Sequence, residues 1–279
     1  LTRAGQQVTV WTRTEEQARI IRQEGITVTD VAGNMAKADT RCVSSEEYAT
    51  ALRQSQLQQA DYILLTVKQT SMDESLLDLL RLALHVDGIV VCYQNGIGHI
   101  EQLTKLLGAR RVAIAVTTEG ARRIAASEVK HTGSGTTKLG MIHHLQHALE
   151  DQVSRRIKVV EQCLNEAGFV TYLSNEITSD VWNKLVINSV INPLTALYGL
   201  LNGELLASPY LLRIMRHLYD EAIRAAASEG VSTAPNLWEQ LLDVCRNTAH
   251  NRSSMLQDVD AGRPTEIEWI NGSLIRVAA

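Results

Sequence analysis

Short apolar, β-branched runs alternate with helical stretches over the first part of the chain, and this alternation restricts the possible folds most. The strand-like runs span residues 8–12, 62–68, 88–92 and 111–116, with helical stretches at 71–84 and 97–107. A strand, a helix and a second strand in this rhythm form a parallel pair. The runs are apolar almost throughout, as expected for strands covered by helices on both faces. The sequence therefore predicts an α/β, Rossmann-type doubly wound parallel sheet.

The pattern changes towards the end of this part and becomes helical in the rest of the chain. Residues 128–141 contain Thr132-Gly-Ser-Gly-Thr-Thr137 between two strand candidates, which favours a hairpin appended to the sheet. A helix at 151–167 and a strand at 169–173 follow. After these, proline residues separate several helices, at Pro209, Pro235 and Pro264. We therefore expect a dinucleotide-binding domain over residues 1–174 and an all-helical domain over residues 175–279.

Both ends of the sequence read as interrupted elements. The first residues indicate a last helical turn closed by Gly5, which leads directly into the strand at 8–12. Residues 270–279 stop while a helical pattern is still running. We therefore expect both domains to be incomplete, the first at its N-terminus and the second at its C-terminus.

Composition narrows the classes of partner and compartment. The 279 residues carry a net charge of -4, and the basic residues are scattered, which argues against a nucleic-acid partner. Apolar runs are far shorter than the roughly 20 residues that cross a bilayer. The four cysteines are far apart without a CxxC pair, which favours reduced thiols and a cytoplasmic location. We expect no metal site, and the oligomeric state is open, with a homodimer as one alternative.

Three polar residues follow the ends of predicted strands, where open α/β sheets bind their ligands. Arg13 ends the first strand at the place where an NAD enzyme usually has an acidic residue, and an arginine there suits the 2′-phosphate of NADP. Lys68 and Asn95 end two later strands, and Asn95 opens an Asn-Gly-x-Gly turn. The alternatives are a solvated surface arginine for Arg13 and an ordinary turn for Asn95.

The helix predicted over residues 179–197 carries an unusual polar stripe. At 100° per residue, Lys184, Asn188, Asn192 and Thr195 share one narrow face of an otherwise apolar helix. A buried lysine must be paired or line a cavity, because an unpaired buried charge is costly. The alternative is a polar face in water, but asparagine is a mediocre helix former and such a face would more usually carry Glu, Lys or Gln.

Other residues of the helical part are also candidates for a functional site. Pro193 lies inside the helix, so it frees a carbonyl group near Ser189 and can kink the helix. Glu266 follows Pro264-Thr265, and we weigh two roles for it: a residue that favours a helix N-terminus, or a counter-charge for Lys184. For Ser253 and Ser254 the plain alternative is a helix turn or cap.

Several ordered motifs together resemble the ketopantoate reductase family along nearly the whole chain. The motifs are Trp182-Asn-Lys-Leu-Val-Ile-Asn-Ser-Val-Ile-Asn-Pro-Leu-Thr-Ala196, Asn202-Gly-Glu-Leu205, Ser253-Ser-Met-Leu-Gln-Asp258 and Thr265-Glu-Ile-Glu-Trp-Ile-Asn-Gly272. The resemblance implies reduction of 2-dehydropantoate to pantoate with NADPH, a step towards pantothenate and coenzyme A. The sequence departs from the family at its start, where the first strand and the GxGxxG loop are missing.

The resemblance also implies roles for individual residues. Lys184 matches the proton donor, and Glu266 matches an acidic residue near the lysine and the nicotinamide. The residues that match substrate contacts are Lys184, Asn188, Asn192, Asn202, Asn251, Ser254 and Asn95. Those that match NADP(H) contacts are Arg13, Lys68, Asn95, Ala121 and Glu266.

The expected reaction is hydride transfer to the carbonyl carbon of a 2-oxo acid while Lys184 protonates the oxygen. Burial would lower the pKa of Lys184 and a nearby Glu266 would raise it, so the direction of the net shift stays open. Two alternatives also stay open. The first is a reductase of another 2-oxo or 3-hydroxy acid on the same fold. The second is a non-catalytic NADP-binding regulator.

Overall fold

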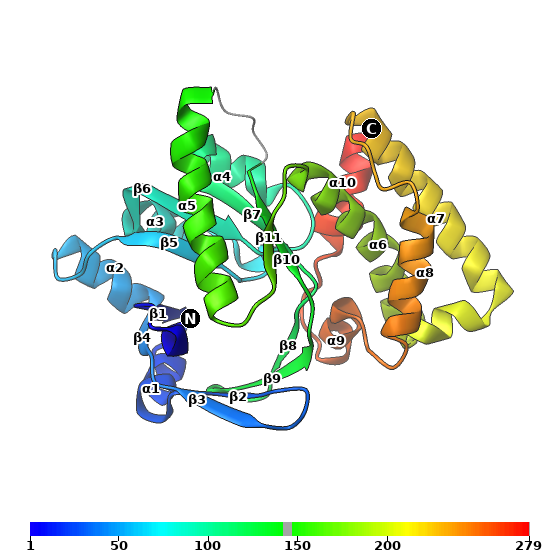
Figure 1. Ribbon diagram of the computed structural model, residues 1–279. Coiled ribbons are helices and arrows are strands. Elements are labelled where there is room, and N and C mark those ends of the chain that lie inside the picture. The colour runs from blue at the N-terminus through cyan, green and yellow to red at the C-terminus, as the bar shows by residue number, and fades with distance from the viewer. Residues whose placement is uncertain (142–146, 279) are drawn as a thin grey trace. The chain divides into compact units, whose positions relative to one another are not determined.

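The computed structural model describes residues 1–141 and 147–278, which fall into two compact units (Figure 1). The first unit comprises Leu1–Leu65, Asp73–Tyr93 and Leu103–Asn175, and the second comprises Thr66–Met72, Gln94–Gln102 and Glu176–Ala279. Two loops from the first part of the chain therefore group with the helical unit. The division into domains at 174/175 stays a prediction.

The largest sheet of the first unit has five strands in the order β11-β10-β7-β6-β5. Its strands β5, β6 and β7 are parallel, β10 is antiparallel to β7, and β11 is parallel to β10. The strands span Ala60–Leu65 (β5), Leu84–Cys92 (β6), Val112–Thr117 (β7), Thr137–Gly140 (β10) and Thr171–Leu173 (β11). The central strands are buried on both faces, as their unbroken apolar sequences predicted.

The remaining described strands form two smaller sheets. The strands β1 (Thr9–Thr12) and β4 (Arg41–Ser44) make a two-stranded parallel sheet. The order β3-β2-β9-β8 gives a four-stranded sheet. Its strands span Ile26–Thr29 (β2), Met35–Ala38 (β3), Gly120–Arg123 (β8) and Glu128–Gly133 (β9). The α/β class is confirmed, but the described strands are divided among three sheets where the sequence predicted one.

The hairpin predicted around residues 132–137 is wrong. Strand β9 pairs with β8 and β2, whereas β10 pairs with β7 and β11, so this segment links two sheets. The physical reason is a close crossing at Gly135, where an added Cβ would lie 2.4 Å from the carbonyl carbon of Thr118. The Thr118 N–H donates to the Thr136 carbonyl at 2.9 Å, which directs the chain towards β7 instead of back along β9.

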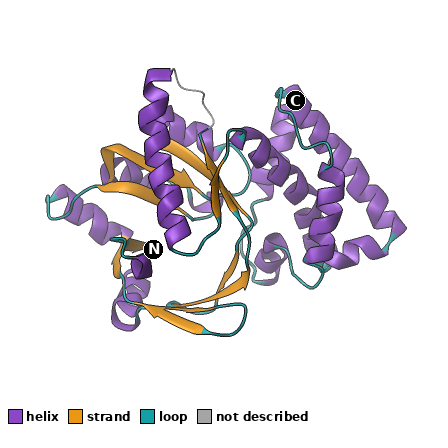
Figure 2. Ribbon diagram, viewed as in Figure 1, coloured by secondary structure: helices purple, strands orange, loops and turns teal. Residues whose placement is uncertain are grey.

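Helices pack on the five-stranded sheet and on the strand pair β1 and β4 of the first unit (Figure 2). They span Glu15–Glu24 (α1), Ser45–Arg53 (α2), Glu74–Ala83 (α3), His99–Leu107 (α4) and His147–Glu166 (α5). Side-chain oxygens of Thr14, Ser44 and Asp73 each accept the N–H group of the third residue of α1, α2 and α3. Ile157, Val160 and Leu164 of α5 pack on buried residues of β6, β7 and β10. Gly5 has φ 87° and ends a short 3₁₀ turn, as predicted.

The second unit is built around one long helix, α6 (Ile177–Tyr198). The other helices span Pro209–Ser228 (α7), Leu237–Asn247 (α8), Ser254–Asp260 (α9) and Ile267–Ala278 (α10), and a 3₁₀ segment covers Asn202–Ala207. Leu185, Val186 and Val190 of α6 are fully buried in the apolar core of this unit. The helix contacts α7, α8, α9 and α10. Among the described helices, none is long and apolar enough to cross a membrane.

The three proline breaks predicted in this part occur where expected. Pro209 is the first residue of α7, where its missing N–H costs nothing, and Pro235 and Pro264 lie just before α8 and α10.

Candidate functional site

The polar stripe of α6 lies against other parts of the second unit and not in bulk water. Asn192 and Thr195 are buried, and Lys184 and Asn188 are partly buried. The Thr195 hydroxyl lies 2.7 Å from Ser253 Oγ, just before α9. The alternative of a fully solvated polar face is therefore wrong, because Asn192 and Thr195 of the stripe are buried.

Lys184 has the most strongly shifted ammonium among the described residues. Burial lowers the pKa of Lys184 from 10.5 to about 8, and the negative charge of Glu266 opposes that shift. Desolvation is thus the larger effect. The side chain is still mostly protonated at neutral pH, and a pKa closer to neutrality than that of an ordinary lysine suits a general acid.

Glu266 is buried and joins three segments of the second unit. Its Oε1 accepts the backbone N–H of Gln69 at 3.2 Å, and its Oε2 accepts Nδ2 of Asn95 at 3.5 Å. Gln69 in turn donates from its side-chain amide to the Asn95 carbonyl. At the start of α10, the backbone N–H groups of Trp269 and Ile270 donate to the backbone carbonyl of Glu266, and not to its carboxylate. Its carboxylate is therefore available as the counter-charge for Lys184.

The turn at Asn95-Gly96 is fixed by a close approach to α10. Gly96 has φ +82°, and an added Cβ would lie 2.2 Å from the Trp269 carbonyl oxygen. The next residue, Ile97, donates its N–H to the same oxygen at 3.3 Å. Gly96 thus allows a close approach to the backbone of α10, next to the contact between Asn95 and Glu266.

Lys68 is held by an acidic residue that the sequence analysis did not single out. Its ammonium forms an ion pair with Asp258 of α9, whose side chain is 3% exposed. Arg263 Nη2 lies 3.1 Å from the other carboxylate oxygen of Asp258. Asp258 closes the motif of residues 253–258, but no spacing rule links position 258 to position 68, so the sequence alone does not predict this pair.

We expect Asp258→Ala to lower the free energy of unfolding by about 1–3 kcal/mol, because it removes a buried acceptor of charged hydrogen bonds while both cations can rehydrate. Urea unfolding measures the change. Asp260→Ala is the matched control, since Asp260 pairs with Arg252 at the exposed surface, and it should cost less than about 1 kcal/mol. Equal losses in the two variants would contradict the role given to burial.

The remaining polar residues predicted for the second unit differ in their burial and in their hydrogen bonds. Asn202 is buried, donates from Nδ2 to Thr248 Oγ1 at 2.8 Å, and donates its backbone N–H to the Asn251 carbonyl at 3.1 Å. Ser253 is the N-cap of α9 and accepts from the Leu256 N–H, as its plain alternative predicted. Asn251 and Ser254 are exposed.

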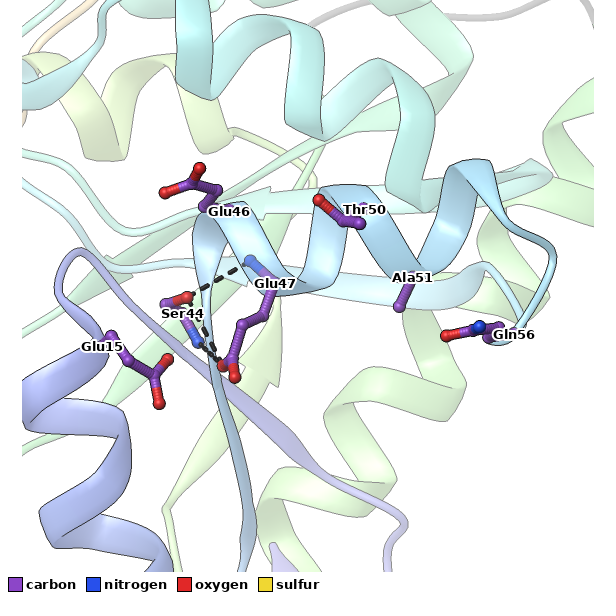
Figure 3. Close-up of a pocket in the computed structure, with 7 residues that line it drawn as sticks. All are labelled: Glu15, Ser44, Glu46, Glu47, Thr50, Ala51 and Gln56. Atoms are coloured by element: carbon purple, nitrogen blue, oxygen red, sulfur yellow. Dashed lines mark hydrogen bonds between the residues drawn. The ribbon is translucent and has the colours of Figure 1, made fainter.

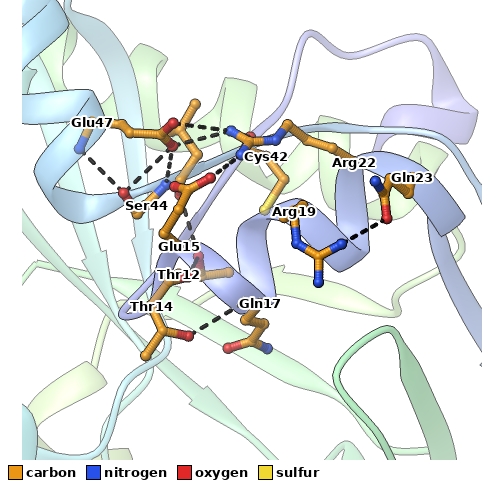
Figure 4. A network of polar contacts seen from close by, with 11 residues as sticks. Thr12, Thr14, Glu15, Gln17, Arg19, Arg22, Gln23, Cys42, Ser44 and Glu47 are labelled. Atoms are coloured by element: carbon orange, nitrogen blue, oxygen red, sulfur yellow. Dashed lines mark hydrogen bonds and ion pairs between the residues drawn. The ribbon is translucent and has the colours of Figure 1, made fainter.

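Arg13 and Ala121 lie in the first unit. Arg13 is exposed just after the end of β1. It forms no hydrogen bond or ion pair with another described residue. The nearby Arg22 is different, because it pairs with Glu15 and with Glu47, the latter at 3.0 Å (Figure 4). Ala121 is exposed in β8 opposite His131. Arg13 therefore keeps a guanidinium free for an anion.

A pocket in the first unit shares Glu15, Ser44 and Glu47 with the polar network drawn in Figure 4, and its lining is acidic (Figure 3). It is lined by Glu15, Ser44, Glu46, Glu47, Thr50, Ala51 and Gln56. Three carboxylates make it unsuitable for a phosphate, and Ser44 and Glu47 already form the capping box of α2. Among the described residues, no three His, Cys, Asp or Glu side chains are grouped to hold a metal ion.

Comparison with known proteins places these residues in a family. The model of "Ketopantoate reductase PanE/ApbA" matches residues 1–144, and that of its C-terminal domain matches residues 176–279. The 2-dehydropantoate 2-reductase of Bacillus subtilis (strain 168) is 33% identical over 98% of this chain and 83% of its own.

Two solved structures share the fold. A PanE/ApbA family ketopantoate reductase from Ralstonia eutropha JMP134 has a TM-score of 0.83 and 23% sequence identity. The superposition covers 99% of this chain and 85% of the reductase chain. D-mandelate dehydrogenase with NADH and anilino(oxo)acetate has a TM-score of 0.85 and 22% identity, with the same coverage. At these identities the likeness concerns the fold alone. The family models and the Bacillus relative establish that the chain belongs to the ketopantoate reductase family.

Proposed function

We propose that this protein reduces 2-dehydropantoate to pantoate with NADPH, a step of pantothenate and coenzyme A synthesis, and that Lys184 is the proton donor. The observation that carries the proposal is the ammonium of Lys184, whose pKa is lowered to about 8 on a packed helix beside two asparagines. Membership of the family supports the substrate and the reaction.

The residues of the second unit would divide the work as follows. The carbonyl oxygen of the substrate gains negative charge as the carbon is reduced, and Lys184 neutralises it by donating a proton. Glu266 keeps the lysine protonated at neutral pH by raising its pKa against the effect of burial. Asn188, Asn192, Asn202, Asn251 and Ser254 would hold the carboxylate and hydroxyl groups of the substrate.

The reduced nicotinamide, when bound, supplies the hydride. The described residues fit such a cofactor in two respects. Arg13 offers an exposed guanidinium that has no hydrogen-bond or ion-pair partner in the described part of the chain, which suits the 2′-phosphate that distinguishes NADP from NAD. Asn95 follows strand β6, its backbone carbonyl accepts from the Gln69 side chain, and its side-chain amide donates to Glu266, so the residue is oriented before a ligand arrives. Lys68 and Ala121 complete the proposed cofactor contacts.

Arg13→Ala is expected to raise the KM for NADPH by about tenfold to a hundredfold and to leave the KM for NADH within about twofold, because a charged hydrogen bond contributes roughly 1.5–3 kcal/mol. Initial rates with each cofactor measure the two effects. Arg19→Ala is the control, since Arg19 is exposed on α1 and bonds only to Gln23 in Figure 4. Equal losses with both cofactors would contradict the assignment of Arg13 to the phosphate.

The proposed reaction is tested by the oxidation of NADPH with a panel of oxo acids: 2-dehydropantoate, pyruvate, oxaloacetate and branched 2-oxo acids. We expect the highest kcat/KM with 2-dehydropantoate. A clear preference for another acid would replace the substrate while keeping the mechanism. Binding of NADPH without turnover of any acid would favour a regulator instead. We also propose a cytoplasmic location. The oligomeric state stays open, with a homodimer as one alternative.

A further inference from the structure

The hydrogen-bond ladder of α6 is interrupted inside the helix. Pro193 has no N–H group, so the carbonyl of Ser189, four residues earlier, lacks its intrahelical donor. Ser189 is 1% exposed, so water does not replace that donor. The helix nevertheless continues to Tyr198. Another group must therefore complete the ladder at this turn.

That group is the side-chain amide of Asn271. Its Nδ2 donates to the Ser189 carbonyl oxygen at 2.9 Å. Asn271 lies on α10, which begins directly after Glu266, so one short segment supplies both the charge acting on Lys184 and the amide that completes α6. The contact joins positions 82 residues apart and adds to the packing of α10 on α6.

We propose that Asn271 is a positioning residue for the polar stripe of α6, a role that rests on the function proposed for Lys184. The interrupted turn spans Ser189 to Pro193 and contains Asn192, while Lys184 and Asn188 precede it. Fixing the Ser189 carbonyl to α10 holds the turn of the helix around Pro193, and so holds Asn192 in place relative to Lys184 and Asn188. Asn271 itself need not touch the substrate.

The test is a double-mutant cycle between positions 271 and 193. Asn271→Leu keeps the branched shape of the side chain but cannot donate, and we expect it to lower kcat with the oxo acid about tenfold while the Kd for NADPH stays within about twofold. Pro193→Ala restores an N–H for the Ser189 carbonyl. In that background Asn271→Leu should lower kcat less than about twofold, an outcome that general damage to the core would not give.

Equal losses of kcat in the two backgrounds, or no loss with Pro193 present, would overturn the proposal. If the Asn271→Leu variant does not fold with Pro193 present, Asn271→Ala replaces it in the same double-mutant cycle. Thermal unfolding of the four proteins gives an independent reading, since the Tm should fall only where Pro193 is present. If no oxo acid were turned over but the unfolding cycle showed this coupling, the proposed function would fail and the hydrogen-bond substitution would stand.

Discussion

Lys184→Ala is expected to lower kcat for the reduction of 2-dehydropantoate by about a thousandfold, within the range of roughly 10²–10⁴ that a positioned general acid contributes. The alkoxide formed by reduction would then take its proton from water. Because the ammonium also binds the substrate oxygen in this account, KM should rise as well. Initial rates of NADPH oxidation measure both constants.

Two variants separate proton donation from charge and from general damage. Lys184→Arg keeps a positive charge but does not give up a proton near neutral pH, so its kcat should stay close to that of the alanine variant. Lys158→Ala removes an exposed lysine of α5 and should leave kcat unchanged. A Lys184→Ala protein with kcat/KM within a few-fold of the wild type would show that another group donates the proton.

Glu266→Gln is expected to give the second-largest effect, a loss of kcat/KM of about tenfold or more at pH 8. The carboxylate raises the pKa of Lys184, so its removal leaves burial unopposed and the pKa falls below about 8. The lysine is then mostly neutral at this pH and cannot donate. The side-chain carbonyl of glutamine can still accept the Gln69 N–H, which preserves the fold around it.

The dependence on pH distinguishes this loss from a structural one. With Glu266→Gln the fall in kcat/KM at high pH should move to lower pH, and the rate at pH 6 should recover most of the wild-type value. Glu268→Gln is the control, because Glu268 is exposed two residues later beside Arg276 and should shift nothing. If kcat/KM of the Glu266→Gln variant fell at the same pH as that of the wild type, Glu266 would not be the residue that raises the pKa of Lys184.

The sequence predicted the helix that carries the site better than the surroundings of that helix. Spacing at 100° per residue put Lys184, Asn188 and Asn192 on one face of α6, and the missing N–H of Pro193 identified a free carbonyl at Ser189. These are local consequences of helical geometry. The group that satisfies Ser189 is Asn271, which no local rule could select because α10 packs on α6 only in the folded chain.

The same limit applies to the fold. Parallel pairing of β5, β6 and β7 followed from local alternation of strands and helices, whereas the pairing of β10 with β7 depended on a close crossing at Gly135 and was predicted wrongly. The buried carboxylate of Asp258 was missed for this reason too, since its partner Lys68 lies 190 residues earlier. The net pKa shift of Lys184 required the structure, because burial and the charge of Glu266 oppose each other.

The most direct test is the rate of NADPH oxidation with 2-dehydropantoate from pH 5 to pH 10. We predict that kcat/KM is level at low pH and falls with the loss of one proton near pH 8, the pKa of the buried Lys184 ammonium, and that Lys184→Ala lacks this limb. Absence of oxidation above the rate without protein, or a kcat/KM that stays level through pH 9, would contradict reduction of this oxo acid with Lys184 as the proton donor.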